Sequence, residues 1–81
     1  MRVKKSDGSE EEFIKEKITV ALVKNGLDIE GAREISNAVE NKFSSRDLLT
    51  SREIRDEVLA RLKSKDASLY QKWLDYENSK S

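Results

Sequence analysis

The segment Ser6-Asp7-Gly8, close to the N-terminus, constrains the fold of this chain more than any other feature. It separates two short segments that can form strands, and its glycine can adopt the left-handed conformation of a bulged three-residue hairpin loop. This loop predicts a register in which Lys5 faces Ser9 and Val3 faces Glu11. A two-residue turn at the Asp-Gly pair is the alternative, and a slip of one residue would move side chains to the opposite face.

One face of the bulged hairpin would combine apolar and charged side chains. Val3 and Phe13 would be buried together there, with Lys5 and Glu11 at the edge of the apolar patch. The helix that follows opens with further positive charge, including Lys17. Such a surface suits a nucleotide, because a base can lie on apolar side chains while cations and the N–H groups of a helix N-terminus bind phosphates.

After the hairpin, apolar residues recur at helical spacing and predict four amphipathic helices. Each helix has one apolar stripe that can face a common core. The members of the four stripes are, in chain order, Ile14, Ile18, Ala21 and Leu22; Ala32, Ile35, Val39 and Phe43; Ile54, Val58, Leu59 and Leu62; and Ala67, Tyr70, Trp73 and Leu74.

Local signals mark where these helices begin and end. Asn25-Gly26 is a typical C-terminal stop, and Asp28 can cap the start of the second helix. The residues from Thr50 to Glu53 form a capping box that opens the third helix, and Asp66 can cap the fourth. Residues 44–47 read as a polar connection between the second and third helices.

These elements predict a mainly α fold with a small β-ribbon, arranged as a four-helix bundle capped by an N-terminal β-hairpin. A lone hairpin is marginal in water, and short helices gain most of their stability by packing an apolar face. The parts therefore need one another. We expect residues 1–77 to form a single domain and residues 78–81 to form a frayed C-terminal tail.

The composition excludes several classes of function. The chain lacks Cys and His, which excludes disulfides, thiolate or imidazole metal ligands, and Cys–His or Ser–His nucleophiles. Its 16 basic residues balance 16 acidic ones, which argues against direct nucleic-acid binding. No apolar run suits a signal peptide or a membrane span, and no Walker-type loop or dinucleotide fingerprint is present. We expect a cytoplasmic protein that is not an enzyme and holds no metal of its own.

The ordered motifs of the chain resemble the ATP-cone domain family. The resemblance extends from Val3 to about Tyr76. It implies a regulatory nucleotide-binding domain, found in ribonucleotide reductases, in the repressor of reductase genes and in some kinases of small phosphorylated acids. The family fold is a helical bundle covered by a small β-ribbon. The matching residues are Val3-x-Lys5-x-Asp7-Gly8-x-x-Glu11-x-Phe13-x-x-x-Lys17-Ile18, then Leu49-Thr50-Ser51-x-x-Ile54, Val58 and Leu62, and finally Ala67, Tyr70 and Trp73.

The resemblance implies a role for nine positions. Lys5 and Lys17 would contact phosphates, and Glu11 would lie near the edge of the base. The ligand would be ATP or dATP, with any Mg²⁺ carried by the phosphates. The remaining positions would line the same site: Val3, Phe13, Ile18 and Ile54 as apolar neighbours of base and sugar, Ser51 as a hydroxyl, and Arg55 as a further phosphate contact.

Two positions depart from the family pattern. Ser6 replaces the second basic residue of a Lys-Arg pair, and Ile14 stands where Asp, Asn or Ser is usual. Losing a charge-assisted contact typically costs about 1.5–3 kcal/mol, so these two residues bear on the affinity for the nucleotide and on the selectivity for its base. Two hypotheses therefore stay open. In the first, the chain is a nucleotide-binding regulator that signals by self-association or through a partner, and we expect no catalytic domain to be attached to it. In the second, it is a degenerate cone that serves as a helical protein-interaction domain without nucleotide.

Overall fold

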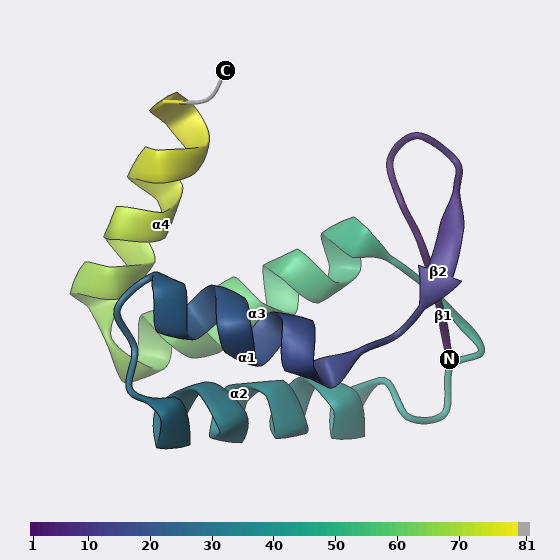
Figure 1. Ribbon diagram of the computed structural model, residues 1–81, viewed down its shortest axis with the longest axis horizontal. Helices are drawn as coiled ribbons and strands as arrows, with labels where there is room; N and C mark the ends of the chain where they lie inside the picture. Colours follow the sequence, from purple (N-terminus) through teal and green to yellow (C-terminus); the bar gives the residue numbers. More distant parts are fainter. Residues whose placement is uncertain (80–81) are drawn as a thin grey trace.

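The computed structural model describes residues 1–79, which form four helices and one small sheet (Figure 1). The predicted fold class, mainly α with a small sheet built by the N-terminus, is confirmed. The last helix reaches Ser79, past the predicted start of the tail at residue 78, and residues 80–81 lie outside the described residues. The elements are β1 (Arg2–Lys4), β2 (Glu10–Glu12), α1 (Lys15–Lys24), α2 (Ile29–Lys42), β3 (Leu48–Thr50), α3 (Ser51–Lys65) and α4 (Ala67–Ser79).

The hairpin of β1 and β2 has the predicted bulged register. Val3 pairs with Glu11, and the Lys5 N–H donates to the carbonyl of Ser9 at 2.8 Å. Gly8 closes the loop with a φ of 90°, in the left-handed region that glycine adopts without steric cost. One side-chain oxygen of Asp7 accepts hydrogen bonds from both the N–H and the hydroxyl of Ser9. The loop is therefore fixed by its own residues.

The sheet has a third strand that the sequence analysis did not predict. β3 pairs in parallel with β1, so the strand order is β2-β1-β3 and β1 is the central strand. Leu49 of β3 is fully buried, and Val3 opposite it is only 6% exposed. A three-residue strand is too short to show an alternating pattern, and its pairing partner is distant in sequence. α3 begins at Ser51, directly after β3, so the sheet fixes the start of this helix.

The core lies between α1, α2 and α3, and most predicted stripe residues face it. The expectation was wrong for Ile14, Ala21 and Ala67, which are exposed. Ile14 is 47% exposed because it precedes the first turn of α1 in an extended conformation. The buried residues of α1 are instead Thr19 and Leu22. The buried core consists of Leu22, Leu27, Ala32, Ile35, Val39, Val58, Leu59 and Leu62, with Phe43, Ile54, Leu69, Tyr70, Trp73 and Leu74 packed against it in part.

The predicted helix boundaries are confirmed by their capping contacts. Gly26 follows α1 with a φ of 115°, and Asp28 accepts a hydrogen bond from the N–H of Gly31 at the start of α2. The Thr50 hydroxyl accepts from the N–H of Glu53 at 3.1 Å. Asp66 caps α4 by accepting from the N–H groups of residues 68 and 69. Polar residues at these positions satisfy N–H groups that a helix leaves free.

The sheet and α4 lie at opposite ends of α1 (Figure 1). The hairpin leads into the start of α1, whereas the end of α1 contacts α4. There the Asn25 side chain donates to the carbonyl of Leu69 at 3.0 Å, and Lys72 donates to the carbonyl of Asn25 at 3.1 Å. One face of α1 therefore extends from the sheet to the last helix.

Candidate functional site

Two predicted phosphate-binding lysines converge on one carboxylate where the hairpin meets α1. Lys5 Nζ lies 3.3 Å and Lys17 Nζ 3.4 Å from the same oxygen, Oε2 of Glu11. The hydrogen bond from Lys5, assisted by the one from Lys17, lowers the pKa of Glu11 below its ordinary value. Both ammonium groups are about half exposed or more, so an anion from solvent can reach them. The structure thus brings these three predicted site residues together.

The start of α3 lies beside this cluster because of the strand register. Lys4 of β1 pairs with Thr50 of β3, and the two strands run in the same direction. The next residues, Lys5 and Ser51, therefore leave the sheet at the same edge. Ser51 is exposed and opens α3, whose N-terminus carries the partial positive charge of a helix dipole. A polar, anion-compatible helix terminus thus adjoins the lysine cluster.

The four apolar positions predicted for the site line the sheet and the first turns of the two helices. Val3 is buried in the central strand, and Phe13 is half-buried after β2. Ile18 of α1 and Ile54 of α3 are half-buried and pack against the core. Each of them supports the fold, and only the exposed part of their surface is open to a ligand.

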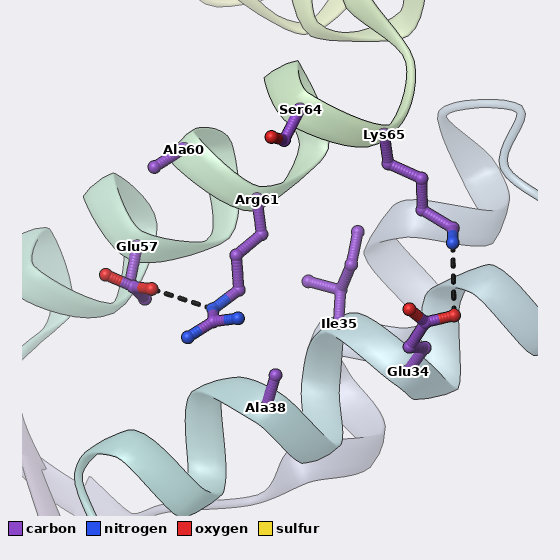
Figure 2. Close-up of a pocket in the computed structure, with 8 residues that line it drawn as sticks. All are labelled: Glu34, Ile35, Ala38, Glu57, Ala60, Arg61, Ser64 and Lys65. Atoms are coloured by element: carbon purple, nitrogen blue, oxygen red, sulfur yellow. Dashed lines mark hydrogen bonds and ion pairs between the residues drawn. The ribbon is translucent and has the colours of Figure 1, made fainter.

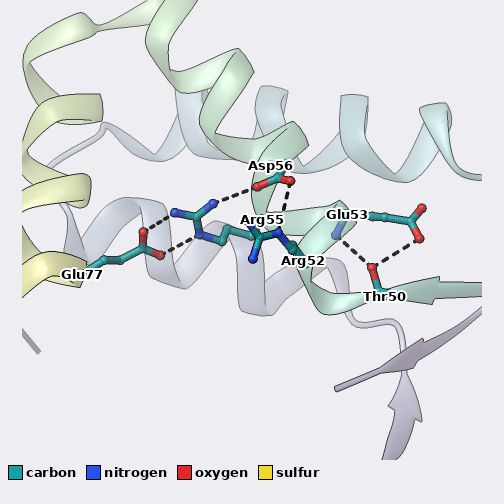
Figure 3. A network of polar contacts seen from close by, with 6 residues as sticks. All are labelled: Thr50, Arg52, Glu53, Arg55, Asp56 and Glu77. Atoms are coloured by element: carbon teal, nitrogen blue, oxygen red, sulfur yellow. Dashed lines mark hydrogen bonds and ion pairs between the residues drawn. The ribbon is translucent and has the colours of Figure 1, made fainter. Parts of the chain in front are cut away.

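Arg55, the ninth predicted site residue, is engaged by α4 (Figure 3). Its guanidinium donates to both carboxylate oxygens of Glu77, with Nε 2.9 Å from Oε2, and a further nitrogen lies 2.8 Å from Asp56. The same Glu77 oxygen accepts the indole N–H of Trp73 at 3.1 Å. These bonds raise the pKa of Arg55, with Glu77 as the main cause, and Arg55 in turn lowers the pKa of Glu77. No described contact joins Arg55 to the lysine cluster.

Glu77 is a residue that the sequence analysis missed. It lies 22 positions from Arg55, and no local pattern links the two. Its spacing of four residues from Trp73 places both on one face of α4, which was the only available signal.

The exposed face of α1 is hollowed between the lysine cluster and α4. A pocket of about 700 Å³ lies between α1 and α4, and a smaller hollow of about 400 Å³ lies along α1. They share Ala21 and Lys24, so the surface continues from one to the other. The larger is lined by Ala21, Lys24, Asn25, Lys72, Trp73, Tyr76 and Glu77, and the smaller by Glu16, Lys17, Val20, Ala21 and Lys24.

A third pocket, of about 500 Å³, lies between α2 and α3 and is a weaker candidate (Figure 2). Its charges are compensated in pairs. Arg61 lies 2.7 Å from Glu57, and Lys65 lies 3.1 Å from Glu34. Glu57 also pairs with Lys42 at 2.8 Å, and this contact is the main reason that its pKa is lowered. This pocket therefore has no excess charge to attract an ion.

The two departures from the family pattern lie at the edge of the site. Ser6 is exposed in the hairpin loop, and Ile14 lies before α1 with no side-chain cap. Lys4 does not replace the missing basic residue, because alternation along β1 directs it away from the face of Val3 and Lys5. The site as described therefore has two hairpin-side cations, Lys5 and Lys17.

Neither a metal site nor a membrane span is present in residues 1–79. No group of three or more Asp or Glu side chains there is placed to hold a metal ion. None of the helices in this range is long and apolar enough to cross a bilayer.

Comparison with known proteins gives one result for the whole chain. A family model described as the ATP cone domain matches residues 1–81. No curated protein matches the chain.

Proposed function

Because the chain belongs to the ATP cone domain family, whose members are regulatory and bind nucleotides, we propose that it is a non-catalytic module that binds ATP or dATP. It signals the bound state by self-association or through a partner protein. A cytoplasmic location, where both nucleotides are available, fits this role.

The observation that carries this proposal is the convergence of Lys5 and Lys17 on Glu11. Both ammonium groups lie within 3.4 Å of one oxygen, so they are already close enough to bind one polyanion together. A triphosphate offers many acceptor oxygens and can contact both lysines at once. Glu11 then becomes free to accept a hydrogen bond from the amino group of the base.

The neighbouring elements supply the other contacts of the proposed site. The half-buried Phe13, Ile18 and Ile54 provide apolar surface for the base and sugar, with Val3 buried in the central strand, and Ser51 provides a hydroxyl at the start of α3. The helix N-terminus favours the negative charge of the phosphates. Mg²⁺ enters with the triphosphate, because phosphate oxygens supply the ligands that this ion prefers.

The readout follows from differential affinity. If one association state, or one partner-bound state, has the better formed site, nucleotide shifts the population toward it by the difference in binding free energy. Sedimentation velocity with and without ATP, and separately with dATP, measures whether the mass of the particle changes.

Calorimetric titration with ATP, dATP and GTP tests the binding itself. We expect heat and a raised melting temperature with ATP or dATP, because a ligand that binds only the folded state stabilises it. The double variant Lys5→Ala/Lys17→Ala should lose both effects while remaining folded, since both side chains are exposed. Lys4→Ala is the matched control, because it removes the lysine next to Lys5, whose side chain lies on the opposite face. Absence of heat and of a melting shift at millimolar nucleotide would refute the proposal.

A second candidate is a helical protein-interaction domain that no longer binds nucleotide. It is favoured by the missing basic residue at Ser6 and by exposed apolar side chains beside and on α1, where Ile14, Val20 and Val23 are 40–50% exposed. Apolar groups gathered on one surface often mark a contact with another protein. Under this alternative, one stoichiometric partner would co-purify with the chain and ATP would change neither its binding nor the melting temperature.

A further inference from the structure

We propose that two copies of this chain associate through the exposed face of α1, packed antiparallel so that Glu16 of each copy lies beside Lys24 of the other. The feature that carries this inference is a row of three exposed residues, Glu16, Val20 and Lys24, which we call the Glu16–Lys24 row. The inference rests on the proposed function for its regulatory role, because it assigns a surface to the self-association named there. The interface itself needs no nucleotide.

The Glu16–Lys24 row lies on the side of α1 that faces away from the core. Residues four positions apart project from the same side of a helix, and all three members of the row are exposed. Val20, at the centre, is 50% exposed, whereas Thr19 and Leu22 are buried on the opposite side. Two helical turns, about 12 Å, separate the acidic end of the row from its basic end.

The two charges of the row are not compensated within one copy. Neither Glu16 nor Lys24 has an ion-pair partner among residues 1–79. By contrast, Lys15 and Lys17 of the same helix both pair with carboxylates of other elements. The row therefore presents two opposite charges that only another molecule can pair.

The order of these charges makes the row complementary to itself. In a twofold dimer the same patch meets its own copy, so residue i contacts residue j and j contacts i. The commonest class of helix packing aligns rows of residues spaced four apart. An antiparallel alignment centred on Val20 places the acidic end of each row beside the basic end of the other. A parallel alignment in register would instead bring like charges together, so the antiparallel arrangement is favoured.

The surface around the row can accept a second helix. A hollow of about 400 Å³ runs along α1 and is lined by all three members of the row, which leaves space for side chains of the other copy. Ala21 is small and exposed, so it permits close approach, and Val23 adds apolar surface that is 40% exposed. Burial of apolar surface supplies most of the affinity of such a contact. Because the contact is confined to one helix face, we expect a weak dimer, with a Kd of about 10 μM to 1 mM.

The proposed interface adjoins the proposed nucleotide site. Lys17 follows Glu16 in the chain, lines the same hollow and also contacts Glu11 of the lysine cluster. A triphosphate held by Lys17 would bring negative charge next to one end of the row. Nucleotide can therefore change the stability of the dimer without touching the second copy.

Sedimentation equilibrium of the nucleotide-free chain, at concentrations from about 10 μM to 1 mM, tests the interface. We expect a reversible monomer–dimer equilibrium for the wild type. Lys24→Glu places like charges beside each other at both ends of the contact and should weaken the dimer about tenfold or more. Arg33→Glu makes the same change of charge at an exposed residue of α2 and should stay within about twofold of the wild type.

A charge exchange within the row separates a loss of contact from a loss of folding. The double variant Glu16→Lys/Lys24→Glu reverses both charges but keeps the row complementary to itself, so its Kd should return to within about threefold of the wild-type value. An equimolar mixture of Glu16→Lys and Lys24→Glu should likewise associate, although each is weak alone. A partner protein with its own fixed charges would not accept the double variant, so the rescue is specific to a second copy of this chain.

The outcomes distinguish this inference from the proposed function. A wild type that stays monomeric throughout, or a double variant that associates no better than Lys24→Glu, overturns the interface, even where calorimetry shows that ATP binds. If the dimer and the rescue occur as expected but ATP yields no heat, the interface stands and the proposed function fails.

Discussion

At the scale of single residues, Glu11 is the carboxylate that compensates the two positive charges of the candidate site. One of its oxygens lies close to the ammonium groups of two lysines from different parts of the fold. Lys5 directly follows β1, and Lys17 belongs to α1. Without this carboxylate the two ammonium groups would repel each other and separate. Glu11 therefore keeps both cations close together in the nucleotide-free protein, and a polyanion can take over the same task.

The ionisation of Glu11 gives a prediction about pH. Because the lysines lower its pKa in the folded protein, Glu11 stabilises the fold at pH values above its unfolded pKa of 4.5, and this contribution is lost as pH falls through the lowered folded value. In Lys5→Ala/Lys17→Ala, the pKa of Glu11 should rise toward the unfolded value. Titration of the Glu11 side-chain carboxyl carbon by NMR measures this pKa in the wild type and in the variant. An unchanged midpoint in the variant would contradict the assigned cause.

At the scale of elements, sequence patterns succeeded where the deciding contacts are local. The hairpin register follows from the loop Ser6-Asp7-Gly8, and the starts of α2, α3 and α4 follow from their capping residues. Each of these signals acts within a few residues along the chain. They were sufficient to predict the four helices and the face shared by Lys5 and Glu11.

Contacts between distant segments could not be predicted in the same way. β3 pairs with β1 across more than forty residues, and its three residues are too few to show an alternating pattern. Arg55 was expected beside the phosphates, but Glu77 on a different helix engages it. Ile14 was expected in the core because it continues the period of α1, yet the helix begins only after it. In each case tertiary packing decides the outcome.

The junction between β3 and α3 gives a prediction at this scale. Thr50→Ala removes the hydroxyl that accepts from the N–H of Glu53 and should lower the free energy of unfolding by about 1 kcal/mol. Thr50→Ser keeps the hydroxyl and should lose much less stability. Urea unfolding followed by circular dichroism measures both variants. Equal stability of the two variants would show that the cap contributes nothing.

At the scale of the whole molecule, the protein is flat, with extents of 32 × 30 × 17 Å. A thin shape leaves few side chains completely enclosed, because small domains bury a modest fraction of their surface. The core therefore depends on contributions from every layer, including the sheet. Val3 of β1 and Leu49 of β3 lie opposite each other in the sheet, and both are buried.

Removal of β1 should consequently affect the entire domain. Deleting residues 1–4 eliminates Val3, exposes the buried Leu49 and leaves β2 and β3 without a pairing partner. We expect the shortened chain to lose its cooperative thermal transition in calorimetry. The control Arg2→Ala/Lys4→Ala keeps β1 and changes only exposed side chains, so its transition should persist. A shortened chain that melts like the control would show that the helices fold without the sheet.

The direct succession of β3 and α3 has a mechanical consequence. β3 ends at Thr50 and α3 starts at Ser51, so no flexible linker separates them. The orientation of α3 is therefore coupled directly to the orientation of β3 in the sheet. Any rotation of β3 within the sheet would be passed on to α3, and the displacement would be largest at the far end of the helix.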